Sequence, residues 1–75
     1  MENRTQRQPE SRWWKRWEAA YQASGGWLGP ATLAIQRENA IRYFQAGASA
    51  NAAGLFCAEQ YQLHSRLTSA LERAA

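Results

Sequence analysis

One segment constrains the fold more than any other part of this 75-residue chain: AGASANAAGLFCAEQYQLHSRL, residues 46 to 67. Ser49 is a good N-cap, because its hydroxyl can accept a hydrogen bond from a free backbone N–H at a helix start. Gly47, just before it, suits the left-handed exit of a preceding helix. Ala52 and Ala53 are small enough for a crossing helix to approach closely. We therefore expect a helix to begin at Ser49.

A tight turn at Cys57 is expected to divide this region into a short helix, residues 49 to 56, and a longer helix, residues 58 to 74. A glycine is usual at such a turn because positive φ costs it nothing, so Cys57 departs from the common pattern. An apolar stripe repeats every four residues along the longer helix and consists of Leu63, Leu67 and Leu71. We expect this stripe to anchor the helix inward and the polar residues between the leucines to face outward.

This layout resembles the helix-turn-helix family of bacterial DNA-binding proteins. In that family the second helix lies in the major groove, and its first two turns contact base edges. The resemblance therefore implies double-stranded DNA as the partner. It places six residues at groove-facing positions: Glu59, Gln60, Tyr61, His64, Ser65 and Thr68. We add Ser49 and Asn51 to the predicted DNA-binding set.

The same resemblance implies structural roles for residues around the predicted turn. Ala53 takes the close-contact position between the two helices, and Leu63 takes the position of the buried anchor. Arg66 falls where the family usually buries an aliphatic residue, so we expect Leu67 to be buried in its place and Arg66 to hold a phosphate. An alternative remains open, because small residues at helix crossings also occur in ordinary small helical bundles.

The basic residues are concentrated near the N-terminus. Residues 18 to 75 contain four arginines and four glutamates, so the whole formal charge of +3 arises before them. On a helix that begins near Pro9, residues three and four apart lie on the same face. One basic face is therefore formed by Arg12, Lys15 and Arg16. We expect this face to contact phosphates. Residues 1 to 8 are expected to form a flexible basic arm that follows DNA in or beside the minor groove.

The other side of this helix is aromatic and carries Trp13, Trp14, Trp17 and Tyr21. We expect these rings to pack in the core, because a small domain needs large apolar side chains to bury enough area. Two alternatives use the same helix differently. It could settle at the headgroup level of a membrane, or it could make the chain a small protein-binding module, such as a phage- or plasmid-encoded inhibitor.

The fold class expected is all-α, with four helices in one domain over residues 9 to 75. The first two helices are predicted at Pro9 to Ala23 and at Pro30 to Ala46, because Gly25 and Gly26 can end the first and Pro30 suits the start of the second. One Cys excludes an internal disulfide and fits a reducing cytosol. With no long apolar run and no leader pattern, we expect a cytoplasmic, bacterial protein associated with the nucleoid or with a plasmid.

The chain offers little for catalysis. It contains no Asp, and its one His, His64, and its one Cys, Cys57, are not an oriented pair of the kind that an activated thiol requires. The scattered Glu residues give no ligand spacing typical of a metal site. We expect no enzyme activity, no cofactor, no metal and no small-molecule substrate.

The size, the basic arm and the helical C-terminus together resemble the N-terminal DNA-binding domain of plasmid stability proteins of the StbA type. That resemblance implies binding to short direct repeats on plasmid DNA, with roles in segregation and repression. A chromosomal or phage repressor would have the same features. Nothing near the C-terminus stops the last helix, so we expect a fragment of a longer protein. The apolar face at Leu67, Leu71 and Ala74 is expected to contact a second copy or a missing segment.

Overall fold

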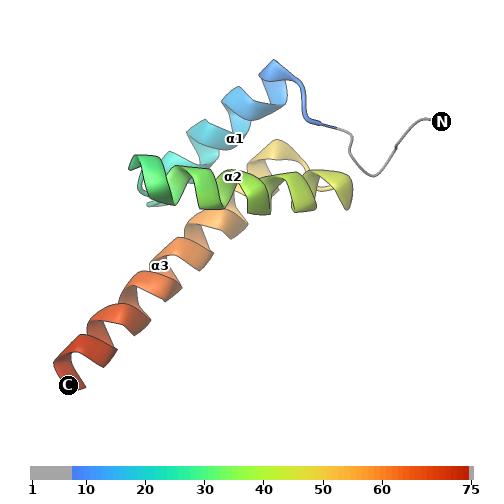
Figure 1. Cartoon of the computed structure of the whole chain (residues 1–75). Coiled ribbons are helices and arrows are strands. Elements are labelled where there is room, and N and C mark those ends of the chain that lie inside the picture. Colours follow the sequence, from blue (N-terminus) through green and yellow to red (C-terminus); the bar gives the residue numbers. More distant parts are fainter. Residues whose placement is uncertain (1–7, 75) are drawn as a thin grey trace.

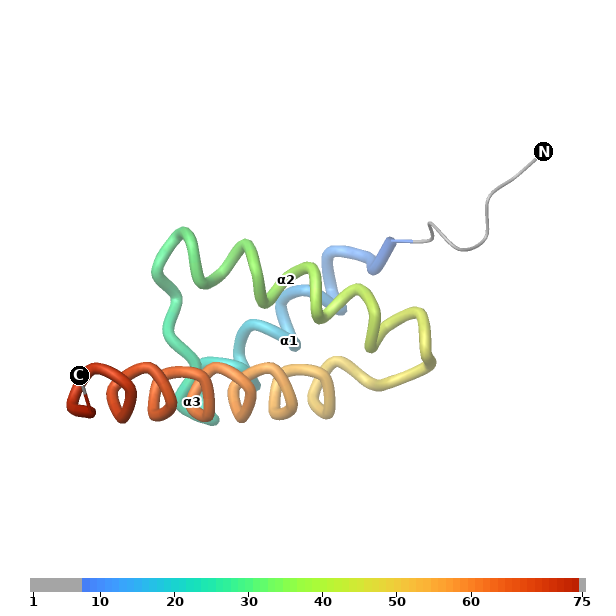
Figure 2. Tube along the Cα trace, turned by 60° about the horizontal axis from the view of Figure 1, so that its bottom comes forward, coloured from blue at the N-terminus to red at the C-terminus, as the bar shows by residue number. Residues whose placement is uncertain are grey.

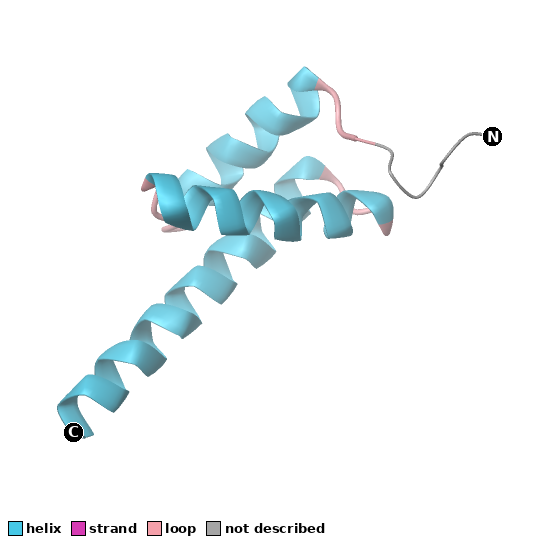
Figure 3. Cartoon of the chain, in the orientation of Figure 1, coloured by secondary structure: helices cyan, strands magenta, loops and turns pink. Residues whose placement is uncertain are grey.

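The computed structural model describes residues 8 to 74, which form three helices. They are α1 (Ser11–Ala23), α2 (Pro30–Gln45) and α3 (Ala50–Ala74) (Figure 1). The described part of the chain contains helices and loops but no strand (Figure 3). The predicted all-α class is therefore confirmed, whereas the prediction of four helices is wrong. The predicted arm lies outside the described residues, except for Gln8.

The helix α3 runs without interruption through Cys57, so the predicted turn at that residue is wrong. Its sequence contains no proline, and its one glycine, Gly54, is tolerated inside a helix. Cys57 itself is fully buried, and its thiol donates to the carbonyl oxygen of Gln36 in α2 at 3.7 Å. What the sequence pattern indicated as two helices is thus one helix that packs against the other two along its first half.

The helices α1 and α2 both end in the same left-handed cap. Gly25 and Gly47 have φ of 94°, a value that glycine adopts without strain. In the second cap, the N–H groups of Gly47 and Ala48 donate to the carbonyl oxygens of Phe44 and Tyr43, at 2.9 Å each. The connections that follow these caps, residues 24 to 29 and 46 to 49, are short (Figure 2).

The predicted N-cap at the start of α3 is confirmed. The N–H of Ala52 donates to the Ser49 hydroxyl oxygen at 3.1 Å, which satisfies a donor that the helix itself leaves unpaired. The connection between α2 and α3 is therefore fixed on both sides, by the glycine cap of α2 and by the serine cap of α3. This fixes where α3 begins relative to the other helices.

The core forms where α1 crosses the first half of α3. The buried stripe of α3 is made of small residues at helical spacing: Ala50, Ala53, Gly54, Cys57 and Ala58. A methyl group on Gly54 would lie 2.6 Å from the Ala20 Cβ and 2.7 Å from the Trp17 carbonyl oxygen. The two helix backbones therefore meet so closely that only a glycine fits at this crossing.

Aromatic rings fill the space beside this crossing, as predicted. Trp17 and Tyr21 are fully buried and stack with their ring centroids 5.1 Å apart. Trp13 and Trp14 are half-buried against the same core, and the Arg37 guanidinium of α2 lies over the Trp14 ring at 5.0 Å. The core packing expected for the tryptophans of α1 is confirmed.

The second half of α3 projects away from α1 and α2 (Figure 1). Where this half begins, the Gln62 amide donates to the Ser24 carbonyl oxygen at 3.1 Å. Every residue of α3 from position 62 to 74 is exposed, and the three leucines of the apolar stripe are exposed by 53%, 56% and 72% in chain order. The prediction that Leu63 and Leu67 are buried is therefore wrong.

No described helix combines the length and the apolar character needed to cross a membrane.

Candidate functional site

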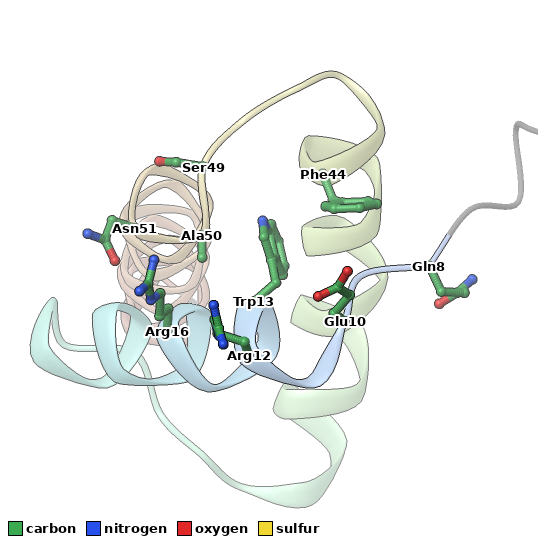
Figure 4. A pocket seen from close by; sticks show the side chains of 9 residues that line it. All are labelled: Gln8, Glu10, Arg12, Trp13, Arg16, Phe44, Ser49, Ala50 and Asn51. Carbon is green, nitrogen blue, oxygen red and sulfur yellow. The ribbon is translucent and has the colours of Figure 1, made fainter.

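A cavity of about 420 Å³ opens at the start of α3, where the first turns of α1 and the last turn of α2 come close to the first turn of α3 (Figure 4). Residues of all three helices surround it. The lining residues are Gln8, Glu10, Arg12, Trp13, Arg16, Phe44, Ser49, Ala50 and Asn51.

The wall of the cavity is aromatic, and its rim is polar. The rings of Trp13 and Phe44 meet edge to face with centroids 5.1 Å apart, so they hold the start of α1 against the end of α2. Arg12 and Arg16 lie one turn apart on α1, and both are exposed. Figure 4 shows both guanidinium groups on the side of the cavity where Asn51 lies.

The electrostatics of this cavity favour an anion. Each guanidinium group carries a positive charge and presents several N–H donors in a fixed plane. The backbone N–H groups at the start of α3 add partial positive charge, as at any helix N-terminus. The Glu10 carboxylate, which also lines the cavity, partly offsets these charges. The site therefore suits an oxyanion that approaches from the Arg12 and Arg16 side.

Four residues of the predicted DNA-binding set come together at this cavity: Arg12, Arg16, Ser49 and Asn51. The exposed basic face predicted on α1 is also present, and its third member, Lys15, is exposed beside the cavity residues without lining it. This group thus combines predicted residues of α1 with predicted residues from the segment that begins at Ser49.

The remaining predicted residues lie farther along α3. Asn51 and His64 lie roughly 20 Å apart along α3, because a helix rises by about 1.5 Å per residue. Gln60, Tyr61 and His64 border a groove of about 350 Å³ between α2 and α3, together with Ile35. Ser65 and Arg66 border a separate hollow, and Glu59 and Thr68 are exposed without lining any of these hollows.

Two of these residues also make contacts within the fold: Gln60 is exposed, as predicted, but bonds to α2, whereas Tyr61 does not face fully outward. The Gln60 amide donates to the Tyr43 hydroxyl at 2.9 Å and accepts from the Asn39 amide at 3.3 Å, which ties α3 to α2. Tyr61 is half-buried against the core. Beyond Tyr61, the polar side and the leucine side of α3 are both exposed.

The sequence prediction missed several residues that form the cavity, among them Trp13, Phe44 and Ala50. A usable signal was present in the spacing of small residues at positions 50, 53, 54, 57 and 58, which repeats with the helical period. That stripe continues through Cys57 and predicts one helix with a buried side of small residues. The turn predicted at Cys57 divided that stripe between two helices.

Two buried groups in the core have raised pKa values. Burial raises the pKa of the Cys57 thiol and, together with smaller effects of Tyr61 and Cys57, raises the pKa of the Tyr21 hydroxyl. The Tyr21 hydroxyl donates to the Trp27 carbonyl oxygen at 2.8 Å, so it has a partner in its neutral form. Among the described residues, no three His, Cys, Asp or Glu side chains gather in a way that could hold a metal ion.

Comparisons with protein-family models, with curated proteins and with solved structures give no match. The resemblances to the helix-turn-helix family and to the StbA type therefore remain predictions from the sequence.

Proposed function

We propose that the chain binds double-stranded DNA at the end of the fold where α3 begins. The observation that supports this proposal most is the convergence of Arg12, Arg16 and Asn51 around one open cavity at a capped helix start. DNA is a polyanion that offers phosphates and base edges side by side, and this end of the chain offers donors for both.

In this proposal the phosphates are held by α1. Arg12 and Arg16 present forked guanidinium groups that match phosphate oxygens, and the start of α3 adds backbone N–H donors to the same place. Lys15, exposed on the same helix, adds charge along the backbone of the DNA. These contacts supply affinity that does not depend on sequence and that falls as salt concentration rises.

The helix-turn-helix in this proposal consists of α2, the connection at residues 46 to 49, and α3. A connection of four residues that contains a glycine has the length and composition typical of this motif. The base-reading residues are then exposed ones in the first two turns of α3 that share the side of Asn51, namely Asn51 and Leu55. An Asn amide can pair with both polar atoms on the major-groove edge of adenine, and apolar side chains can contact the thymine methyl group.

The first test is to select binding sites from a random duplex pool and to measure discrimination by variants. Asn51→Ala should relax preference at particular base pairs by about 1 to 3 kcal/mol, because it removes a paired base contact. His64→Ala is the matched control on the same helix, and it should keep the preference of the parent chain. Lost discrimination in His64→Ala together with full discrimination in Asn51→Ala would contradict this proposal.

The second test concerns phosphate contacts. Arg16→Ala should weaken binding to all sequences alike and reduce the slope of log affinity against log salt by about one. Arg73→Ala removes an equally exposed arginine from the far end of α3 and should leave that slope nearly unchanged. Equal effects of the two variants would mean that net charge, and not this end of the molecule, supports the binding.

The selected sites would also separate the possible biological roles. Direct repeats would favour plasmid stability and segregation, as the StbA resemblance implies. Inverted half-sites one helical turn apart would favour a transcriptional repressor that binds as a symmetric pair. We place the alternative of a protein-binding module second, because Trp17 is buried and Trp13 and Trp14 pack on the core, so α1 turns its basic face outward.

A further inference from the structure

An apolar ridge on α3 is partly covered by α2 along its first part and uncovered along its second part. The Tyr43 ring of α2 lies over Phe56, with centroids 5.5 Å apart, and the Tyr43 hydroxyl bonds to Gln60. At spacings of three and four residues, the same side of the helix continues through Leu63, Leu67 and Leu71. These leucines therefore extend a face that α2 already uses as a helix-packing surface.

The uncovered part of the ridge has the features of a helix-packing surface without its partner. Its leucines are more than half exposed, and every residue from position 63 to 74 is exposed. An isolated helix as short as the uncovered part of α3 is marginally stable in water. A second helix laid along the ridge would remove both the apolar exposure and the tendency of this segment to unravel.

We infer that the partner is a second copy of this chain, which pairs through the same ridge in the antiparallel direction. A two-fold axis near Leu67 then places Leu67 against Leu67 of the second copy and Leu63 against Leu71 of the second copy. Such a contact is self-complementary, because each copy contributes the same apolar surface. This pairing is independent of DNA binding, which uses the opposite end of α3.

The position of α2 determines the direction of pairing. In each copy α2 covers the ridge at Phe56 and Gln60, directly before the uncovered leucines. In a parallel pair, the two α2 helices would meet at the same level and hold the ridges apart. In an antiparallel pair, each α2 lies beyond the C-terminal end of the other copy's α3, and the helix dipoles oppose each other favourably.

Charges beside the ridge fit the antiparallel direction in part. Glu59 and Arg73 lie on the same flank of the ridge, near its two ends. Antiparallel pairing brings Glu59 of one copy toward Arg73 of the second copy, and the symmetry repeats this pair. Arg66 lies on the same flank at the centre, where the two copies' arginines come near each other and oppose association.

The area available predicts a weak dimer. Burying the exposed part of each leucine removes roughly 100 Å² of apolar surface, so the contact falls in the size class of transient interfaces. We expect association that depends on concentration in the micromolar range or above. We do not expect a permanent dimer.

Sedimentation velocity of the full chain without DNA tests the pairing directly. The parent chain should shift from monomer to dimer as its concentration rises. Leu67→Asp should abolish this shift, whereas Ser69→Asp, which places the same charge about 200° around the helix, should keep it. Near-ultraviolet circular dichroism of the tryptophans should be unchanged in both variants, because Trp17 lies in the body.

Single cysteines test the direction of pairing. Under mild oxidation, Leu67→Cys should form a covalent dimer, because the two-fold axis brings the same position of both copies together. Leu63→Cys alone should not, since antiparallel pairing separates its two copies by roughly 12 Å, beyond the reach of a disulfide. A mixture of Leu63→Cys and Leu71→Cys should cross-link, and the buried Cys57 of the parent chain should not.

Three results would overturn the inference. The first is a parent chain that stays monomeric up to the highest concentration reached. The second is equal cross-linking of Leu63→Cys and Leu67→Cys, which would indicate parallel pairing. The third is a monomeric chain that binds lipid vesicles through Leu67, which would identify the ridge as a membrane contact.

Discussion

The two halves of α3 differ in a way that reverses the usual expectation for apolar residues. The first half buries small side chains, such as Ala53 and Gly54, whereas the second half exposes its leucines. Small residues are buried because they let α1 approach the backbone of α3 closely. The leucines of the second half are exposed because neither α1 nor α2 packs over them. Within one helix, burial therefore follows the position of the neighbouring helices and not the size or hydrophobicity of the side chain.

The same division separates two kinds of surface. The start of α3 is fixed by caps, by the Trp13 and Phe44 contact and by close packing on α1, so the cavity beside it is rigidly placed. The end of α3 has no such support from the described residues of α1 and α2. We assign the rigid end to DNA, where geometry matters, and the projecting end to a second copy, which would supply the missing support.

The largest expected effect is the loss of the aromatic side chain that packs on the first half of α3. Trp17→Ala should lower the free energy of unfolding by about 3 to 5 kcal/mol, because it removes a fully buried indole and leaves a cavity. Leu67→Ala, in the second half, should change the stability of the dilute chain by less than about 0.5 kcal/mol. Urea unfolding followed by circular dichroism measures both values.

Trp27→Ala provides the control for residue type, because Trp27 is 59% exposed. This variant should lower the free energy of unfolding far less than Trp17→Ala does. If Leu67→Ala destabilised the dilute chain as much as Trp17→Ala, the second half of α3 would have to be packed, and the contrast between the halves would be wrong.

The next largest effect is expected at the helix crossing. Gly54→Ala should destabilise the chain by about 2 to 3 kcal/mol, although Ala is the better helix former, because the added methyl group must push α1 and α3 apart. Ser69→Ala, in the projecting half, should be neutral or slightly stabilising. A stabilising Gly54→Ala would show that the two backbones are not in close contact.

The smallest expected effect is on the pH dependence of stability. Burial raises the pKa of Cys57 above the ordinary thiol value of 9.0, so above that pH the unfolded chain has lost a proton that the folded chain keeps. The free energy of unfolding should therefore fall as pH rises past 9.0, by at most about 1.4 kcal/mol per pH unit for this group. Tyr21 adds a similar contribution above 10.0.

The variant Cys57→Ala shows how much of the fall in stability at high pH comes from the Cys57 thiol. The variant should be less stable at neutral pH, because its core is underpacked, but its stability should fall less steeply in alkaline solution. An identical alkaline slope in the variant and the parent chain would mean that Cys57 is not buried in the first half of α3.

The sequence predicted the ends of helices better than it predicted their packing. The cap residues Ser49 and Gly47 act locally, through hydrogen bonds and backbone angles that a few neighbours determine, and both predictions are confirmed. The core role of the tryptophans in α1 is also confirmed, because little else in a chain of this size can fill a core. The limits of α1 and α2 were predicted to within two residues.

The candidate site was harder to predict, because it depends on which residues come together from separate helices. Helical spacing identifies Leu63 and Leu67 as members of one face, but it does not show whether another helix covers that face. The turn at Cys57 was inferred from a resemblance in layout, although that position has no residue that breaks a helix. Gln60 is exposed, as expected, but its hydrogen bond to Tyr43 depends on how α2 packs.

Backbone amide hydrogen exchange along α3, measured at a low and a high protein concentration, tests the contrast between its halves most directly. We expect strong protection from Ala53 to Ala58, unbroken at Cys57, at both concentrations. Protection from Leu63 to Leu71 should be weak in dilute solution and should rise with concentration as copies pair. A gap in protection at Cys57, or equal protection of both halves in dilute solution, would contradict a single helix that is packed at one end and projecting at the other.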